Sequence, residues 1–217
     1  MTQQLEWIRS TVTDDVTYPA APWPLLGSLW LTLFRVAEAV DERHPAGLYG
    51  AAFVSYEAGS PLTYSELLVA HPVEPENGRG RRIRITDIWV DSPQSVAGGR
   101  ELWAIPKGLA DFDLETERRG PFTTTAWGCT LGRTPVAAAT FKDVSGIAPR
   151  TPFKAGLSQP GIEDTGFENR TATMQGSSKV FPARARWDVN PDGPVGFLAG
   201  AQQLASFRQA SFRMSVG

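Results

Sequence analysis

Residues 85–113, ITDIWVDSPQSVAGGRELWAIPKGLADFD, contain the change of pattern that decides the fold. The stretch begins inside a predicted strand, 82–90, whose first half alternates between polar and apolar residues. Residues 91–93, Asp-Ser-Pro, then favour the start of a helix, because capping side chains precede a proline at an early helical position. We expect this helix to run to about Trp103, since Pro106 disfavours helical geometry in the residue before it.

The remainder of the chain is mostly β in pattern. Apolar residues occupy both alternate faces of 29–34, which is typical of a strand covered on both sides. Residues 144–178 are rich in Gly, Pro, Ser and Thr, and we expect a long surface loop, a lid or an interface arm there. Many strands around one central helix predict a single α+β domain over residues 1–217, built on a mostly antiparallel sheet or barrel. The strands are expected at 29–34, 49–56, 64–73, 82–90, 111–115, 123–130, 136–141, 180–187 and 206–214.

The composition excludes several function classes. A net charge of −2 argues against a nucleic-acid partner. One cysteine, Cys129, excludes an internal disulfide framework, and with two histidines the chain offers little for a metal site. No phosphate-binding loop or dinucleotide fingerprint is present, so we expect no cofactor. The N-terminus lacks a secretory pattern and prolines interrupt the uncharged run 16–34, so we expect a cytoplasmic protein without a membrane partner.

Lys107 is the main candidate for a catalytic residue. It is one of only four lysines among 21 basic residues, and it follows the helix in the apolar segment 102–110. No carboxylate lies nearer in sequence than Glu101 or Asp111. Burial of an ammonium in apolar surroundings lowers its pKa, so we expect a neutral amine able to form a Schiff base with a carbonyl compound. The alternative is a lysine whose charged end reaches water beside the helix end.

The sequence resembles the acetoacetate decarboxylase family from about residue 47 to residue 113. The resemblance rests on residues 99–101, Gly-Arg-Glu, which lead through an aromatic residue to Pro106-Lys107, and on residues 64–67, Tyr-Ser-Glu-Leu, upstream. In this family the lysine after the proline is the Schiff-base nucleophile, and the glutamate of the upstream motif faces the active site. The resemblance therefore implies that Lys107 is the nucleophile.

Glu66 is the second candidate for a catalytic residue. On a strand, its side chain shares a face with Tyr64 and Leu68. A carboxylate on an apolar face is paired, neutral or functional, and a raised pKa would suit a proton donor or acceptor beside an imine. The alternative is a structural ion pair with a buried arginine, for which Arg35 and Arg100 are the candidates.

The chain departs from the family pattern at Gly108, where the decarboxylase proper has a second lysine. Glu57 and Arg35 are the nearby candidates for the family's second carboxylate and its substrate-binding arginine. We therefore expect a cofactor-free lyase that uses Lys107 and Glu66 to form a Schiff base with a keto acid or related carbonyl compound. The alternatives are aldol, dehydration or cyclisation chemistry on the same lysine, and a non-catalytic small-molecule-binding barrel. The resemblance also implies a barrel or cone with few helices, and a homo-oligomer.

Overall fold

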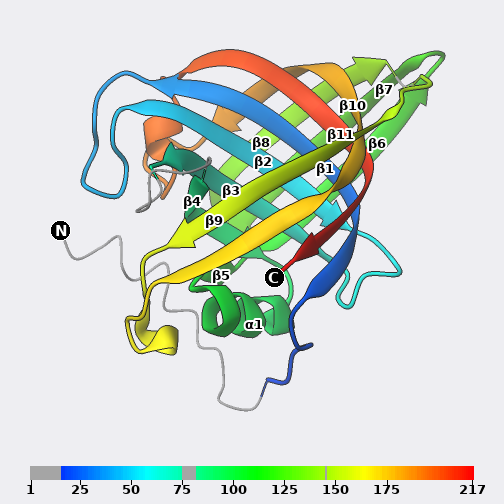
Figure 1. Cartoon of the computed structure of the whole chain (residues 1–217). Helices are drawn as coiled ribbons and strands as arrows, with labels where there is room; N and C mark the ends of the chain where they lie inside the picture. The colour runs from blue at the N-terminus through cyan, green and yellow to red at the C-terminus, as the bar shows by residue number, and fades with distance from the viewer. Residues whose placement is uncertain (1–15, 75–81, 145) are drawn as a thin grey trace.

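The computed structural model describes residues 16–74, 82–144 and 146–217. Within these ranges the chain forms eleven strands, one α-helix and two short 3-10 helices (Figure 1). The helices are α1 (Pro93–Trp103), η2 (Glu163–Thr165) and η3 (Gly196–Leu198). The strands are β1 (Trp23–Val36), β2 (Gly47–Tyr56), β3 (Tyr64–Val73), β4 (Arg82–Val90), β5 (Lys107–Leu109), β6 (Asp111–Arg119), β7 (Phe122–Leu131), β8 (Thr134–Val144), β9 (Arg150–Gln159), β10 (Arg170–Val189) and β11 (Gln202–Val216).

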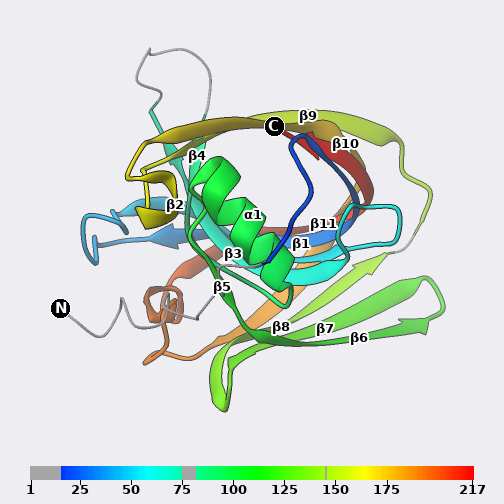
Figure 2. The same ribbon diagram turned by 90° about the horizontal axis from the view of Figure 1, so that it is seen from below.

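The strands are joined in one sheet whose pairing closes on itself. β1, β2, β3 and β4 pair antiparallel in succession, and β9 lies parallel to β4. β10 pairs with β9 and β11, and β11 returns to β1, so that seven of the described strands form a closed ring of pairings. β8, β7 and β6 extend the sheet from the second half of β10. These three strands form a layer beneath β1–β3 (Figure 2).

Alternating side chains give strands β1 and β2 two largely buried faces. On β2, Tyr49 and Phe53 belong to a core that also contains Trp127 of β7, and the Phe53 and Trp127 rings stack with their centres 5.2 Å apart. Ala52 and Val54, which alternate with them, line the interior of the ring. β1 has the same alternation, which confirms the predicted strand with two apolar faces.

Helix α1 begins and ends where the sequence predicts. Ser92 caps its start by accepting a hydrogen bond from the Ser95 amide at 3.2 Å, and Pro93 is its first residue. The helix ends at Trp103, and Ala104 then adopts a left-handed conformation with φ of 55°. α1 lies across one end of the ring of strands (Figure 2), where it covers the interior.

Residues 144–178 do not form the long loop that their composition suggests. β9 and the first half of β10 occupy most of this stretch and pair with each other, and β9 also pairs with β4. Backbone pairing and the burial of Leu157 in the interior stabilise strands whose own residues carry a weak strand pattern. The predicted loop or lid is therefore wrong, because the neighbouring strands supply partners that composition does not reveal.

The predicted mostly antiparallel α+β fold is confirmed. Among the described strands, only the pairs β4–β5 and β4–β9 are parallel. The part of the chain that the structure describes has no helix with the length and apolar character needed to cross a membrane. Residues 1–15, which the sequence analysis examined for a secretory signal, lie outside the described ranges.

Candidate active site

Lys107 is the first residue of β5, the short strand that follows α1. The chain leaves the helix through Ala104, and Lys107 then pairs in parallel with Ile88 of β4. This pairing directs the lysine side chain into the ring, where the residue is only 3% exposed. β5 therefore fixes the backbone from which the lysine enters the interior.

The Lys107 ammonium has three oxygen neighbours. Nζ donates a hydrogen bond to Glu66 Oε2 at 2.9 Å and another to Ser95 Oγ at 2.9 Å. It also donates to the hydroxyl oxygen of Tyr64 at 3.4 Å and lies 5.0 Å from the centre of that ring. Glu66 is 41 residues away in sequence, so the fold, and not the local sequence, brings the two charges together.

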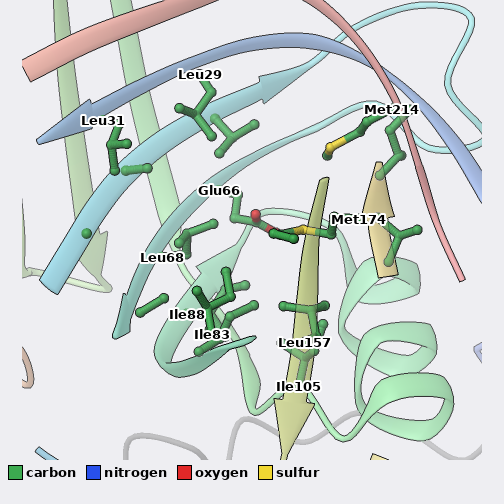
Figure 3. A pocket seen from close by; sticks show the side chains of 18 of the residues that line it. Leu29, Leu31, Glu66, Leu68, Ile83, Ile88, Ile105, Leu157, Met174 and Met214 are labelled. Atoms are coloured by element: carbon green, nitrogen blue, oxygen red, sulfur yellow. The ribbon is translucent and has the colours of Figure 1, made fainter. Parts of the chain in front are cut away.

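Glu66 lies on β3 with its side chain directed into the interior (Figure 3). The residue is 2% exposed, and the Tyr56 hydroxyl donates to its Oε1 at 3.0 Å. Tyr64 and Leu68 line the same interior, which confirms the predicted strand face. Both carboxylate oxygens are therefore hydrogen-bonded, one to a lysine and one to a tyrosine.

Neither arginine considered as a partner for Glu66 contacts it. Arg35 is exposed near the end of β1. Arg100 of α1 instead pairs with both carboxylate oxygens of Asp164 in η2, with an Nη2–Oδ2 distance of 2.7 Å. Its Nη1 also donates to the backbone oxygen of Lys107 at 3.3 Å. Arg100 therefore connects α1, η2 and the backbone of the lysine, while Glu66 pairs with Lys107.

The protonation of Lys107 differs from the sequence-based expectation. Burial lowers the pKa of this amine, but the charge of Glu66 and the hydrogen bonds to Glu66 and Tyr64 outweigh burial and raise the pKa of Lys107 above its ordinary value. The expected lowering of the pKa is therefore wrong, because a carboxylate remote in sequence lies beside the amine. The resting site is an ion pair.

Tyr56 and Tyr64 are protonated hydroxyl groups beside this ion pair. Burial, followed by the charge of Glu66, raises the pKa of Tyr56 well above 10. Burial also raises the pKa of Tyr64, although the charge of Lys107 acts in the opposite direction. Both phenols can therefore donate hydrogen bonds at neutral pH.

Two contacts of the site, Tyr56 and Ser95, are not evident from the sequence pattern. Tyr56 is the cross-strand partner of Tyr64, a pairing that sequence periodicity does not specify. Ser95 lies one helical turn before Gly99, a spacing that places both on one face of α1 and could have been noticed. A Cβ at Gly99 would lie 2.8 Å from Lys107 Cδ, so the lack of a side chain at this glycine lets the helix pack closely against the lysine.

The ring encloses a cavity of about 400 Å³ beside the Lys107–Glu66 pair. Its walls are mostly aliphatic and aromatic, and Trp103 is among them. Figure 3 shows part of this lining around Glu66: Leu29, Leu31, Leu68, Ile83, Ile88, Ile105, Leu157, Met174 and Met214. The pair therefore lies in largely hydrocarbon surroundings.

Few ionisable side chains of the described residues line this cavity. They are Glu66, His71, Lys107 and Lys154, together with the phenols Tyr56 and Tyr64. Glu57 and Arg35, the candidates for a second carboxylate and a substrate-binding arginine, are not among them. Within the described ranges, no group of three His, Cys, Asp or Glu side chains is arranged to hold a metal ion. The cavity therefore offers amine, carboxyl, imidazole and phenol groups for chemistry.

A family model described as acetoacetate decarboxylase matches residues 38–159. This range covers more than half of the chain and includes both Glu66 and Lys107. A comparison with curated protein sequences found no match.

Solved structures with the same fold include three enzymes. The enduracididine biosynthesis enzyme MppR, complexed with pyruvate, is 16% identical with a TM-score of 0.69, over 94% of this chain and 91% of its own. An acetoacetate decarboxylase-like enzyme from Sphingomonas wittichii RW1 is 14% identical with a TM-score of 0.65, over 95% and 93%. Acetoacetate decarboxylase from Legionella pneumophila is 16% identical with a TM-score of 0.60, over 92% and 86%.

The family match and the shared fold lead to the same conclusion. At identities this low, the solved structures establish the fold, and the matched residues establish the relationship. Together they support an enzyme of the acetoacetate decarboxylase-like type. The chain belongs to the acetoacetate decarboxylase family.

Proposed function

We propose that the chain is a Schiff-base-forming lyase that acts on a ketone, keto acid or related carbonyl compound, with Lys107 as nucleophile and Glu66 as proton acceptor and donor. The observation that carries the proposal is the buried 2.9 Å contact between Lys107 Nζ and Glu66 Oε2 inside an apolar cavity. A buried ion pair contributes little net stability, because desolvation of both charges offsets their attraction. A lysine and a carboxylate at the wall of a ligand-sized cavity are instead suited to covalent chemistry.

Glu66 supplies the proton acceptor that Lys107 needs. Transfer of one proton along the hydrogen bond from Nζ to Oε2 leaves a neutral amine and a carboxylic acid. This neutral pair is favoured when an apolar carbonyl compound fills the cavity, because the surroundings of the two charges then become less polar. The amine is thereby released for attack where the carbonyl compound binds.

The Schiff base forms in two steps that balance within this pair. Nζ attacks the carbonyl carbon, and the carbonyl π electrons move to the oxygen, which takes a proton from the nitrogen. The Glu66 acid then protonates the resulting hydroxyl, which leaves as water. The product is a protonated imine opposite the Glu66 carboxylate, so the charge pattern of the resting ion pair is restored with the imine in place of the ammonium.

The protonated imine accepts the electron pair of an adjacent breaking C–C or C–H bond and becomes an enamine. In an aldol cleavage, Glu66 takes the proton of the β-hydroxyl group as the C–C bond breaks, the hydroxyl oxygen becomes the carbonyl of the departing aldehyde, and Glu66 then returns the proton to the enamine carbon. Addition of water to the imine then releases the ketone and the free lysine. The imine itself is the electron acceptor, so the proposed reaction uses no cofactor.

The second candidate function is a Schiff-base reaction other than decarboxylation, and two observations favour it. Gly108 occupies the place of the second lysine of the decarboxylase. Within the described lining, Lys107 is the one buried cation, and it is already paired with Glu66. A substrate carboxylate near the imine would therefore have no cation of its own, whereas aldol, dehydration or cyclisation chemistry needs none. MppR, complexed with pyruvate, shows that this fold also holds a keto acid.

Borohydride trapping tests the proposed nucleophile. Incubation with a ketone or keto acid and borohydride should add the mass of the reduced adduct to the peptide that contains Lys107. Lys107→Met should abolish the adduct, whereas Lys142→Met, at an exposed lysine on β8, should retain it. A folded protein that gives no Lys107 adduct with any carbonyl compound would contradict the proposal.

Product analysis then separates the candidate reactions. Release of carbon dioxide from acetoacetate would identify decarboxylation. A trapped imine without gas release, together with aldehyde or water as a product, would identify aldol or dehydration chemistry. Ligand binding that survives Lys107→Met, with no turnover of any carbonyl compound, would identify a non-catalytic binding protein.

A further inference from the structure

We infer that the cavity is an apolar channel for the body of the substrate, and that the site takes a ketone or aldehyde carrying a long hydrocarbon chain. The inference rests on the proposed function for the reaction at the carbonyl group. Three features of the cavity indicate this substrate class: its length, the small residues in its middle and its mostly uncharged walls.

The channel follows the strands away from the Lys107–Glu66 pair. On β3, Glu66, Leu68, Ala70 and Pro72 all line the cavity. From Glu66 to Pro72 the strand advances by six residue steps, or about 20 Å. Glu66 at one end is 2% exposed, Leu68 and Ala70 between the ends are partly or fully buried, and Pro72 at the other end is exposed. The reactive pair therefore lies at the buried end, and the other end opens toward the surface.

Small residues keep the channel open in its middle. Gly50 and Ala52 of β2 and Ala70 of β3 all line it, and Gly50 pairs with Ala70 across the two strands. A Cβ at Gly50 would lie 3.1 Å from Leu31 Cδ1, so even one methyl group would narrow the channel here. Larger side chains at these positions would separate the outer part of the cavity from the reactive pair.

Among the described residues, the middle of the channel offers no cation to a charged substrate body. Apart from Lys107, the lining cation within the described ranges is Lys154, which is exposed on β9. Burial lowers the pKa of His71, so its imidazole is uncharged at neutral pH. A carboxylate placed between these ends would be buried without a partner, which is costly. The walls therefore favour hydrocarbon over charge.

The size of the cavity also favours a long substrate. Its volume of about 400 Å³ lies in the range of pockets that enclose drug-sized ligands, about 300–1,000 Å³. A keto acid of three or four carbons would leave the outer apolar walls uncovered. A longer hydrocarbon chain would cover them and gain the free energy of removing that surface from water.

Borohydride trapping with a homologous series of methyl ketones, from 2-butanone to 2-undecanone, tests the inference. The concentration that gives half-maximal trapping at Lys107 should fall about fourfold for each methylene group that the channel buries. The half-maximal concentration should stop falling once the hydrocarbon chain of the ketone reaches the open end of the channel. Half-maximal concentrations that do not change along the series would overturn the inference.

Variants in the middle of the channel locate the effect. Gly50→Leu and Ala70→Phe should each reduce the advantage of 2-undecanone over 2-butanone by about tenfold or more, because the longer chain no longer fits. Ala138→Leu, at an exposed position of β8 outside the cavity, is the matched control. Its half-maximal concentrations should follow ketone length as those of the wild type do. Circular dichroism checks folding, and the two channel variants are independent of each other. A folded channel variant that keeps the full advantage of the long ketone would contradict the inference.

Secondary alcohols of the same lengths separate this inference from the proposed function, because they cannot form an imine. Calorimetric binding of 2-undecanol that weakens in Gly50→Leu would support the channel even if no ketone were trapped at Lys107, an outcome that rejects only the Schiff base. Trapping of all ketones with equal efficiency, together with no binding of 2-undecanol, would retain the Schiff base and reject the channel.

Discussion

Lys107 and Glu66 are each the other's charged partner in a cavity whose other walls are mostly hydrocarbon. Either charge alone would be unfavourable there, because a buried ion without a partner keeps the full cost of its desolvation. Tyr56 and Ser95 satisfy further hydrogen bonds of the pair. At the scale of residues, the site therefore behaves as one unit, and the removal of one member affects the other.

Glu66→Leu is expected to lower the free energy of unfolding by about 3–5 kcal/mol, because it leaves the Lys107 amine buried without its carboxylate. The double variant Glu66→Leu with Lys107→Met should recover most of this loss, since no charge remains to be buried. Urea unfolding of the wild type, both single variants and the double variant measures the coupling. Losses that simply add in the double variant would show that the two side chains do not depend on each other.

The sequence could identify these two residues but not their contact. Lys107 was predicted from its apolar segment and the Pro-Lys motif, and Glu66 from its place on an apolar strand face. Their contact arises because β3 and β5 lie on opposite sides of β4, and hydrophobic periodicity does not specify which strands become neighbours. The direction of the Lys107 pKa shift depends on this contact, which is why the prediction from local sequence was wrong.

At the scale of elements, α1 positions the lysine through its glycines. The backbone of Gly99 packs against the Lys107 side chain, and Gly98 packs against the Trp23 ring, where a Cβ would lie 2.6 Å from a ring carbon. Glycine weakens a helix interior by about 1 kcal/mol relative to alanine. The helix thus gives up some intrinsic stability for close contact with the lysine on one side and the ring of strands on the other.

Gly99→Ala is expected to displace the Lys107 side chain, because the new methyl group would lie 2.8 Å from its Cδ. We expect the rate of imine trapping to fall by about tenfold, since small misplacements of a reacting group have large effects on rate. The matched control is Gly98→Ala, whose methyl group meets Trp23 and Tyr18 instead. It should reduce stability without a comparable loss of trapping in the folded fraction. Equal trapping rates in both variants would refute the positioning role of Gly99.

The sequence predicts the helices and strands whose own residues carry strong start, stop or periodicity signals. It does not predict strands that form because neighbouring strands supply hydrogen-bonding partners. The Asp-Ser-Pro start and the Pro106 stop specify α1 locally. β9 has no such signal, and its mostly polar sequence forms a strand because β4 and β10 supply hydrogen-bonding partners on both sides. The same dependence explains why β10 begins ten residues before the predicted strand at Val180.

At the scale of the whole molecule, a buried histidine connects distant parts of the chain. His44, in the connection between β1 and β2, is 2% exposed. Its Nδ1 lies 2.9 Å from Asp41 Oδ1, its Nε2 lies 2.9 Å from Asp87 Oδ2 of β4, and its ring packs against Phe197 of η3. Burial lowers the pKa of His44, but Asp87 and Asp41 outweigh burial and the nearby Arg43, and raise it above 6.5.

The stability of the protein should therefore fall as the pH rises above 6.5. A histidine whose pKa is raised on folding contributes stability that is fully present below its unfolded pKa and is lost as the pH passes the folded value. Urea unfolding across this range should show the decline in the wild type and a smaller one in His44→Gln. The pKa of His71 is lowered, so it titrates below this window and His71→Gln should keep the decline. An unchanged decline in His44→Gln would exclude His44 as its source.

The closure of the ring by β11 has a consequence for how the protein acquires its structure. β11, near the end of the chain, pairs with β1, near its start. The hydroxyls of Thr32 and Ser206, which are 174 residues apart in sequence, form a hydrogen bond of 2.8 Å between these two strands. Contacts of such long range form only after a large loop has closed, and chains that depend on them fold slowly. Until β11 is in place, the apolar faces that will enclose the cavity remain open to other chains. The ring closure that encloses the Lys107 amine in the native protein thus lengthens the period during which the folding chain is prone to aggregate.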